Sequence, residues 1–289
     1  MPTFLQEARR VAIGVAEAAG DLLRSKAERR FHVWPKSDRD LVTELDYAAE
    51  ELIFKQLRNA YPDHQIISEE AGVLPGVGQW SWLVDPLDGT NNIALGLAIY
   101  TVGLSLCKGS LPVVSVVHDP VSRRTWSAVR GQGAYLGRDL PLKRRSRVGS
   151  REVLAWSQGY GVSPQDSTAV ALKLILDREA TRVLRLWAPL MAWIMLARGD
   201  LDGIVGYRIG EIDLHSGALI ATEAGLKVCD PTGFPFDSEF RSLQENRSLI
   251  AGANDRIPRL VELWLAADKI RAHIDDFWRD YTPVKSKPF

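Results

Sequence analysis

Two aspartates, Asp85 and Asp88, come directly after the apolar run Trp82-Leu83-Val84 and are separated by only two residues. Pro86 restricts the backbone between them and Gly89 permits a sharp turn, so their carboxylates are expected to lie close together. Unpaired carboxylates at short distance repel each other, and a divalent cation between them relieves that repulsion. Because hard oxygen ligands suit Mg²⁺, the segment predicts a magnesium site.

The segment that follows, from Gly89 to Asn92, has the composition of a turn that opens a helix. The free N–H groups and the positive dipole end of such a turn attract an anion. Further acids, Glu69, Glu70 and Asp213, fall at an expected strand end or just before an expected helix, from which they can reach the same sheet edge. Metal-binding carboxylates beside an anion-binding turn indicate a phosphate site.

Hydrophobic periodicity predicts two helices and then several strands in the first half of the chain. Apolar residues recur at three- and four-residue spacing from Phe4 to Leu23, and again from Thr43, whose hydroxyl is expected to cap the helix, to Leu57. Short apolar runs then predict strands, and the turns between them favour a mostly antiparallel meander. The expected strands are Gln65 to Ser68, Trp80 to Val84, Tyr100 to Cys107, Val113 to His118 and Thr125 to Arg130.

Strand and helix alternate in the second half. The expected strands lie at Val153 to Ser157, Val183 to Leu186 and Gly203 to Val205 and near Lys227 and Leu249, and the helices at Thr168 to Ile175, Leu190 to Ala197, Leu214 to Ala224 and Ile257 to Ile274. This pattern predicts an α+β or α/β layered sandwich that forms a single domain over residues 1–289. A soft boundary near 140–150 separates an N-terminal α+β half, 1–145, from a C-terminal α/β half, 146–289.

Composition excludes several classes of protein. Lys plus Arg and Asp plus Glu each number 36 among 289 residues, so no global field favours a nucleic acid or an anionic membrane surface. Charges within the first 20 positions argue against a signal peptide, and no apolar run approaches the roughly 20 residues of a membrane span. Cys107 and Cys229 fit no metal or redox motif, which favours buried thiols in a reducing compartment. We therefore expect a cytoplasmic globular enzyme.

In these residues the chain resembles the inositol monophosphatase-like phosphatases, part of the lithium-sensitive, Mg²⁺-dependent sugar phosphatase superfamily. The resemblance runs from the first helix to the last. The matching motifs, in family order, are Asp40-Leu41-Val42-Thr43-Glu44-Leu45-Asp46, Glu69-Glu70, Asp85 to Asn92 and Asp213 to Gly225. The resemblance implies the inositol monophosphatase/fructose-1,6-bisphosphatase-like sugar phosphatase fold, hydrolysis of a small phosphomonoester, inhibition by Li⁺ and Ca²⁺, and a homodimer.

The same resemblance implies roles for individual residues. Two or three Mg²⁺ ions would be held by carboxylates and one backbone carbonyl, from Glu69, Asp85, Leu87, Asp88 and Asp213. Thr90, partnered by Asp46, would orient a metal-activated water for in-line attack, and Gly89 with Thr90 would bind the phosphate. A metal would stabilise the leaving alkoxide, so a covalent phosphoenzyme is not needed.

The residues expected to contact the alcohol half of the ester depart from the family pattern. Relatives carry Gly-Ser/Thr-Ala where this chain has Trp187-Ala188-Pro189, and inositol-specific relatives place a hydroxyl-accepting acid where it has Gly206. Glu70 completes this expected substrate pocket. A pocket without hydroxyl acceptors discriminates weakly among esters. Candidates besides inositol phosphate are therefore other sugar or polyol phosphates, fructose 1,6-bisphosphate, histidinol phosphate and 3′-phosphoadenosine 5′-phosphate, and Trp187 could stack on a ring or apolar face of the substrate.

Several residues also fit simpler interpretations. The D-x-x-D-G-T segment suits a strand-ending turn, Glu70 a solvated or ion-paired acid, and Asp213 an N-cap. His215 has no second His or Cys beside it in sequence and is expected to be structural, and the basic stretch from Lys143 to Arg151 to face water. A regulatory protein that keeps the fold and binds a partner is the alternative from another class. Phosphate release from a panel of phosphomonoesters distinguishes it from an enzyme.

Overall fold

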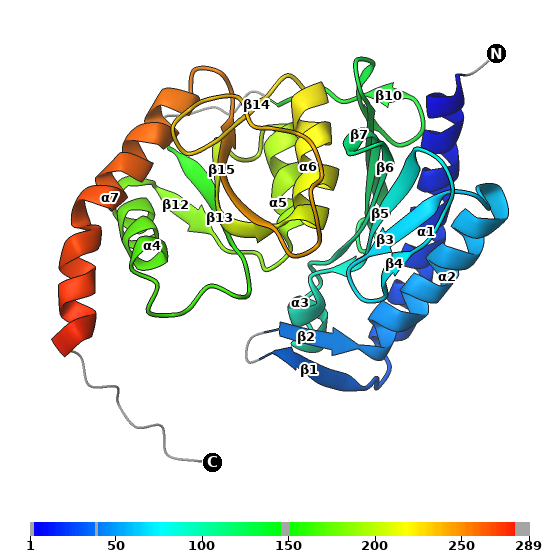
Figure 1. The fold of residues 1–289 in the computed structure, drawn as a ribbon, viewed down its shortest axis with the longest axis horizontal. Coiled ribbons are helices and arrows are strands. Elements are labelled where there is room, and N and C mark those ends of the chain that lie inside the picture. The colour runs from blue at the N-terminus through cyan, green and yellow to red at the C-terminus, as the bar shows by residue number, and fades with distance from the viewer. Residues whose placement is uncertain (1–2, 38–39, 146–150, 281–289) are drawn as a thin grey trace.

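The structure is a computed structural model that describes residues 3–37, 40–145 and 151–280. Helices and sheets alternate in layers (Figure 1). From the N-terminal side outward, two helices cover an eight-stranded sheet, two central helices separate it from a five-stranded sheet, and two further helices cover the far face. The pairs are α1 (Phe4–Ala27) with α2 (Glu44–Ala60), α5 (Pro189–Arg198) with α6 (Glu211–Glu223), and α4 (Ser167–Glu179) with α7 (Ile257–Asp280). The expected layered α+β fold is confirmed.

The eight-stranded sheet has the order β10-β9-β8-β7-β6-β5-β3-β4. Its strands are β3 (Gln65–Ser68), β4 (Gly72–Leu74), β5 (Trp80–Asp88), β6 (Thr101–Lys108), β7 (Leu111–Asp119), β8 (Arg124–Val129), β9 (Gly133–Leu136) and β10 (Leu140–Pro141). Neighbours pair antiparallel except β3 with β5, which agrees with the expected meander. The parallel pair brings the ends of β3 and β5 to one edge of the sheet, where the acids lie.

The five-stranded sheet has the order β12-β11-β13-β15-β14 and is mixed, with β11 parallel to both of its neighbours. Its strands are β11 (Val153–Gln158), β12 (Arg182–Leu184), β13 (Gly203–Gly210), β14 (Lys227–Cys229) and β15 (Asn246–Gly252). The change from one sheet to the other falls between β10 and β11. Residues 146–150 of the expected boundary, which include part of the basic stretch, lie outside the described residues.

A hairpin of β1 (Val33–Ser37) and β2 (Asp40–Thr43) was not anticipated from sequence, and neither were the short strands β4, β9 and β10. The hairpin precedes α2, and the one-turn helix α3 (Thr90–Ala94), which is the helical turn expected after Gly89, packs beside it (Figure 1). Every residue of β1 is exposed. Because period-two burial is the pattern that identifies a half-buried strand, this hairpin left no signal in the sequence.

Helix α6 begins earlier than expected, which corrects the interpretation of Asp213. Its N-cap is Gly210, so Asp213 lies in the first turn of the helix and is not the N-cap. Glu211 and His215 are both helical and form an i,i+4 pair, with Oε2 of Glu211 3.0 Å from Nε2 of His215. That pair fixes the start of the helix before Leu214.

Burial accounts for the central position of α6. Apolar residues occur all round the helix and are buried on both sides, which is the pattern of a helix enclosed between two sheets. Gly217 is required there, because a Cβ at this position would approach the Trp193 ring of α5 to 2.1 Å. Cys107 and Cys229 are free and buried, as expected.

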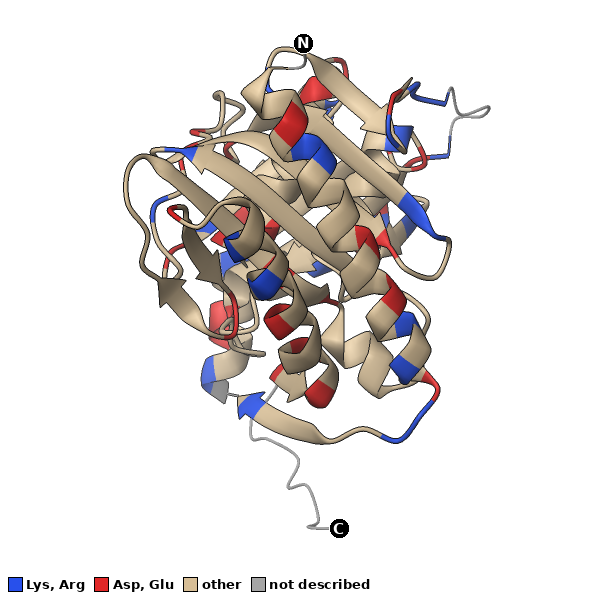
Figure 2. Ribbon diagram, turned by 90° about the vertical axis from the view of Figure 1, so that its right-hand side faces the viewer, with Lys and Arg blue, Asp and Glu red and all other residues tan. Residues whose placement is uncertain are grey.

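Charged residues of both signs are interspersed over the helices and strands seen in Figure 2. This distribution follows from the equal numbers of acidic and basic side chains. In the described part of the chain, no helix combines the length and apolar character that crossing a membrane requires.

Candidate metal and phosphate site

Three carboxylates from three elements converge at the edge of the eight-stranded sheet. Glu69 follows β3, Asp85 belongs to β5 and Asp213 lies in α6, and one oxygen atom of each lies within 4.8 Å of the others. Asp85 is 1% exposed. Its Oδ1 accepts a hydrogen bond from the Leu87 N–H at 3.0 Å, whereas its buried Oδ2 has no hydrogen-bond partner in the described structure. A buried carboxylate oxygen without a donor fits a cation, and an all-oxygen ligand set suits Mg²⁺.

The raised pKa values of Asp85 and Asp213 agree with a binding site for a positive charge among these carboxylates. Burial raises the pKa of Asp85 well above its ordinary value, and the neighbouring charges of Glu69 and Asp213 raise it further. Burial, followed by the charge of Glu69, raises the pKa of Asp213 to about 7. Without a cation, burial and repulsion therefore favour protonation of Asp85 and Asp213, and a divalent ion would favour their ionised form.

Lys36 is the cation that reaches this cluster, and sequence reasoning missed it. Its Nζ lies 3.2 Å from Oε1 of Glu69 and 2.8 Å from Oε1 of Glu70. Burial alone would lower the pKa of Lys36, but the two glutamates raise it above the ordinary value. Glu70 is thus the ion-paired acid of the simpler interpretation and is not among the cavity-lining residues. No pattern in the sequence singles out Lys36, because this residue lies in strand β1, whose residues are all exposed.

Asp88 is held differently from the other acids of its motif. Its Oδ2 accepts hydrogen bonds from the Thr101 hydroxyl at 2.8 Å and from the Leu190 N–H at 3.0 Å. It is not one of the three carboxylates whose oxygens lie within 4.8 Å in the described chain. Burial and then the charge of Asp213 raise the pKa of Asp88 well above its ordinary value. Asp88 therefore interacts electrostatically with the cluster but is not one of its three carboxylates.

Thr90 and Asp46 form the hydrogen-bonded pair expected from the sequence. The Thr90 hydroxyl lies 2.8 Å from Oδ1 of Asp46 and 3.0 Å from the Leu87 carbonyl. Oδ2 of Asp46 accepts from the N–H of Thr43 at 2.8 Å and from its hydroxyl at 2.6 Å, in the capping box that begins α2. One carboxylate thus caps a helix with one oxygen and orients a hydroxyl with the other.

Gly89 is required by both conformation and space. Its φ is 99°, in the left-handed region, and a Cβ there would lie 2.7 Å from the Ile99 carbonyl oxygen. Gly89 caps α3, whose first N–H groups have no acceptor within the helix. The Asn92 amide of the same turn donates to the carbonyls of Ile99 and Leu186, at 2.7 and 2.6 Å. The bond to the Leu186 carbonyl holds the turn against the segment that carries Trp187.

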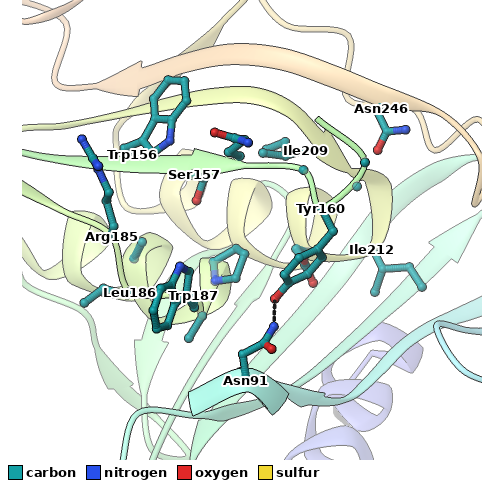
Figure 3. A pocket seen from close by; sticks show the side chains of 18 of the residues that line it. Asn91, Trp156, Ser157, Tyr160, Arg185, Leu186, Trp187, Ile209, Ile212 and Asn246 are labelled. Atoms are coloured by element: carbon teal, nitrogen blue, oxygen red, sulfur yellow. Dashed lines mark hydrogen bonds between the residues drawn. The ribbon is translucent and has the colours of Figure 1, made fainter. Parts of the chain in front are cut away.

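A cavity of about 800 Å³ extends from Glu69 and Asp213 into the C-terminal half. Figure 3 shows Tyr160 and Trp187 within it, and the Tyr160 hydroxyl accepts a hydrogen bond from Nδ2 of Asn91 at 3.2 Å. Trp187, Ala188 and Pro189 line the cavity as expected. Gly206 does not line it, because this residue is buried in β13 opposite Leu249 of β15. Tyr160, Leu186 and Ile212 line it and were missed.

Glu211 also lines the cavity, but its carboxylate is paired with neighbouring groups of the protein. Its Oε2 lies 3.0 Å from Nε2 of His215 and accepts from the Arg241 N–H at 2.7 Å, and its Oε1 lies 2.5 Å from Nε of Arg247. Burial alone would raise the pKa of Glu211, but the His215 hydrogen bond and the other partners lower it. His215 is buried in this network, in line with the structural role expected for it.

Comparisons with known proteins agree with this geometry. The model of the Inositol monophosphatase family matches residues 5–265. Inositol monophosphatase 1 of Solanum lycopersicum is 32% identical over 81% of this chain and 88% of its own length. Nus factor SuhB of Pseudomonas aeruginosa is 34% identical over 79% of this chain and 87% of its own length.

Solved structures show the same fold. The extragenic suppressor protein suhB of Bartonella henselae superimposes with a TM-score of 0.79 at 26% identity, covering 89% of this chain and 98% of that one. The inositol monophosphatase of Thermotoga maritima, at 23% identity, superimposes with a TM-score of 0.78 and covers 92% and 99%. With its layered fold, its converging acids and a family match along nearly all of its length, the chain belongs to the inositol monophosphatase family and is a phosphomonoester hydrolase.

Proposed function

We propose that this chain hydrolyses a small phosphomonoester in a Mg²⁺-dependent reaction. The observation that carries the proposal is the buried Oδ2 of Asp85, which has no hydrogen-bond partner in the described structure and belongs to a cluster with Glu69 and Asp213. Two or three Mg²⁺ ions would be held by these three carboxylates, with Asp88 and the Leu87 carbonyl as further ligands. Bound there, Mg²⁺ supplies Lewis-acid polarisation of the phosphate, an acidified water and stabilisation of the leaving alkoxide.

The residues around the cluster would position the reactants. The Thr90 hydroxyl has one proton, and when it donates that proton to Asp46 its oxygen is left as an acceptor. A water that donates to this oxygen is oriented for attack, and Asp46 can receive a proton through the hydroxyl. Gly89 and the first N–H groups of α3 would bind the phosphate oxygens, which match their dipole.

The test is phosphate release from a panel of phosphomonoesters with and without Mg²⁺. We expect Mg²⁺-dependent turnover that Asp213→Asn and Asp88→Asn both lower by orders of magnitude, since each removes a charge that the metals need. The matched control is Asp255→Asn, because the Asp255 side chain is 80% exposed and lies outside the site. Near wild-type turnover of either site variant would refute the assignment.

The panel should include the substrates that family and sequence suggest. These are inositol phosphate, other sugar and polyol phosphates, fructose 1,6-bisphosphate, histidinol phosphate and 3′-phosphoadenosine 5′-phosphate. Inhibition by Li⁺ and Ca²⁺, a cytoplasmic location, a homodimer, and no binding of nucleic acid or membrane complete the proposal. Size-exclusion chromatography with light scattering tests the dimer, and the same phosphate-release assay tests the two ions.

A regulatory role is the second candidate, because relatives about one third identical are named Nus factor SuhB. In that case the chain would act by binding a partner, with or without turnover. No phosphate release from any member of the panel, in protein that Mg²⁺ stabilises, would favour this function over the first.

A further inference from the structure

We propose that the alcohol half of the substrate carries an aromatic ring or a similarly flat apolar group, which stacks on Trp187. The inference rests on the proposed phosphatase function and names the class of ester that this site prefers. It distinguishes such a substrate from a polyol phosphate, whose alcohol half offers hydroxyl groups in every direction.

Aromatic and aliphatic side chains line the cavity beside its charged and polar residues. Trp187 is 54% exposed, and Figure 3 shows it in the same pocket as Tyr160, Leu186 and Ile212. Trp156 also lines the cavity but is only 6% exposed, whereas Tyr160 is 39% exposed, so Trp187 and Tyr160 provide the accessible rings. Large rings that remain accessible inside a cavity present faces on which a flat group can stack while its apolar surface leaves water. The lining therefore favours an apolar alcohol.

The backbone at Trp187 is a second, independent observation. Its φ of 51° lies in the left-handed region, which a residue with a bulky side chain adopts only at a cost in free energy. A glycine at this position would relieve the strain. A strained, exposed ring in a ligand-sized cavity is better explained by contact with a ligand than by stability of the fold.

The carboxylates that line the cavity have other partners and do not serve as acceptors for the hydroxyl groups of a polyol. Among the described lining residues the carboxylates are those of Glu69, Glu211 and Asp213. Glu69 and Asp213 belong to the proposed metal site, and both oxygens of Glu211 are close to His215, Arg241 and Arg247. The cations Lys36, Lys173 and Arg185 also line the cavity. Lys36 pairs with Glu69 and Glu70, and Arg185 pairs with Asp177. The neutral polar side chains of the lining include Ser157, Gln158 and Asn246. No lining carboxylate remains to select a ring of hydroxyls.

Hydrogen bonds also link the backbone beside Trp187 to the turn proposed to bind phosphate. Nδ2 of Asn92, in the turn proposed to bind phosphate, donates to the carbonyl of Leu186 at 2.6 Å. Asn91 of the same turn donates to the Tyr160 hydroxyl across the cavity. The chain segment that carries Trp187 and the Tyr160 hydroxyl are thus both hydrogen-bonded to the turn proposed to bind phosphate, and we expect an ester with its ring a few bonds from the phosphorus to reach both.

The experiment compares 2-phenylethyl phosphate with glycerol 1-phosphate and inositol 1-phosphate in the presence of Mg²⁺. We expect kcat/KM for the phenyl ester to exceed that for either polyol ester by about tenfold, the size of one good stacking contact. Trp187→Gly should remove most of this preference, mainly through a higher KM for the phenyl ester, and should lower kcat/KM for that ester more than for glycerol 1-phosphate. Trp187→Phe should restore much of the preference. The matched control is Phe234→Gly, at an aromatic residue that is 71% exposed and does not line the cavity.

The outcomes separate this inference from the function on which it rests. If none of the three esters releases phosphate, the proposed function itself fails for this panel, and the inference fails with it. If a polyol ester is hydrolysed better than the phenyl ester, the phosphatase assignment stands and the aromatic preference is refuted. An equal loss for all three esters in Trp187→Gly would mean that the residue supports the fold, which also overturns the inference.

Discussion

Replacing Asp85 by asparagine should stabilise the metal-free protein while abolishing its response to Mg²⁺. Asparagine keeps Oδ1 as an acceptor for the Leu87 N–H. Its Nδ2 takes the place of the buried Oδ2, which has no donor in the described structure, and can donate to the neighbouring carboxylates. The substitution therefore removes a buried negative charge and adds hydrogen bonds in a single change.

The expected gain can be worked from the geometry. At separations of no more than 4.8 Å, and with an effective dielectric constant of about 20, one pair of like unit charges costs about 3.5 kcal/mol. Asp85 faces two such partners, Glu69 and Asp213, but the ammonium group of Lys36, 3.2 Å from Glu69, offsets much of one of them. At pH 8, where Asp213 with a pKa of about 7 is mostly ionised, a net gain of about 3 kcal/mol follows if Asp85 stays ionised. Because its raised pKa lets Asp85 take up a proton instead, this figure is the upper bound of the gain. In a chain of this length it corresponds to a rise in Tm of up to about 5 °C.

Thermal unfolding in EDTA and in excess Mg²⁺ measures both halves of this prediction. A cation at about 100 times its dissociation constant stabilises the wild type by about 2.7 kcal/mol. The variant, with a ligand removed, should gain little from Mg²⁺ and should release no phosphate. The control is Asp255→Asn, which should follow the wild type in both solutions. An Asp85→Asn protein that unfolds below the wild type in EDTA would refute the claim that the metal-free carboxylates repel each other.

Three further predictions concern other parts of the molecule. Thr90→Ser keeps the hydroxyl that bonds Asp46 and should retain most of kcat, whereas Thr90→Val should lower it about 10²- to 10⁴-fold in the phosphate-release assay. Burial lowers the pKa of His118, so the unfolded chain takes up that proton first. Stability should fall by up to about 1.4 kcal/mol per unit as pH drops below about 6.5, and urea unfolding of His118→Asn should lack that component. The carboxylates that face His118 are those of Glu17, Asp21 and Asp119. Gly217→Ala forces a methyl group against Trp193 and should cost about 1–3 kcal/mol or more in the same unfolding assay.

The sequence predicted the elements that bury a regular face and missed those that do not. Helix α2 was found from its periodicity and from the Thr43 cap, which the structure confirms. The β1–β2 hairpin was missed because β1 is exposed throughout, and with it Lys36 was missed. The start of helix α6 was expected at Leu214, whereas the helix begins at Glu211. Its first turn includes the pairing of Glu211 with His215, which helix propensity alone does not reveal.

The residues of the candidate site also fall into two groups, those that belong to one local motif and those that only the packing of the sheets brings together. Asp85, Thr90 and Gly89 lie within one local motif, so their proximity follows from the strand and the turn. Tyr160 reaches the site only because the two sheets pack around α6, and no spacing in the sequence encodes that distance. The residues proposed for the chemistry could thus be identified from sequence, whereas most of the alcohol-side wall required the fold.

This division has a physical consequence for specificity. Two hydrogen bonds join the phosphate-side residues of β5 and α3 to the alcohol-side segment: Asn92 donates to the Leu186 carbonyl, and Asp88 accepts from the Leu190 N–H. Both bonds use backbone groups of that segment, so they do not depend on which side chain occupies position 187. We therefore expect the tryptophan at position 187 to leave Asp85 and Thr90 in place. A single substitution at this position should then change the alcohol preference while the carboxylates proposed to bind Mg²⁺ stay the same.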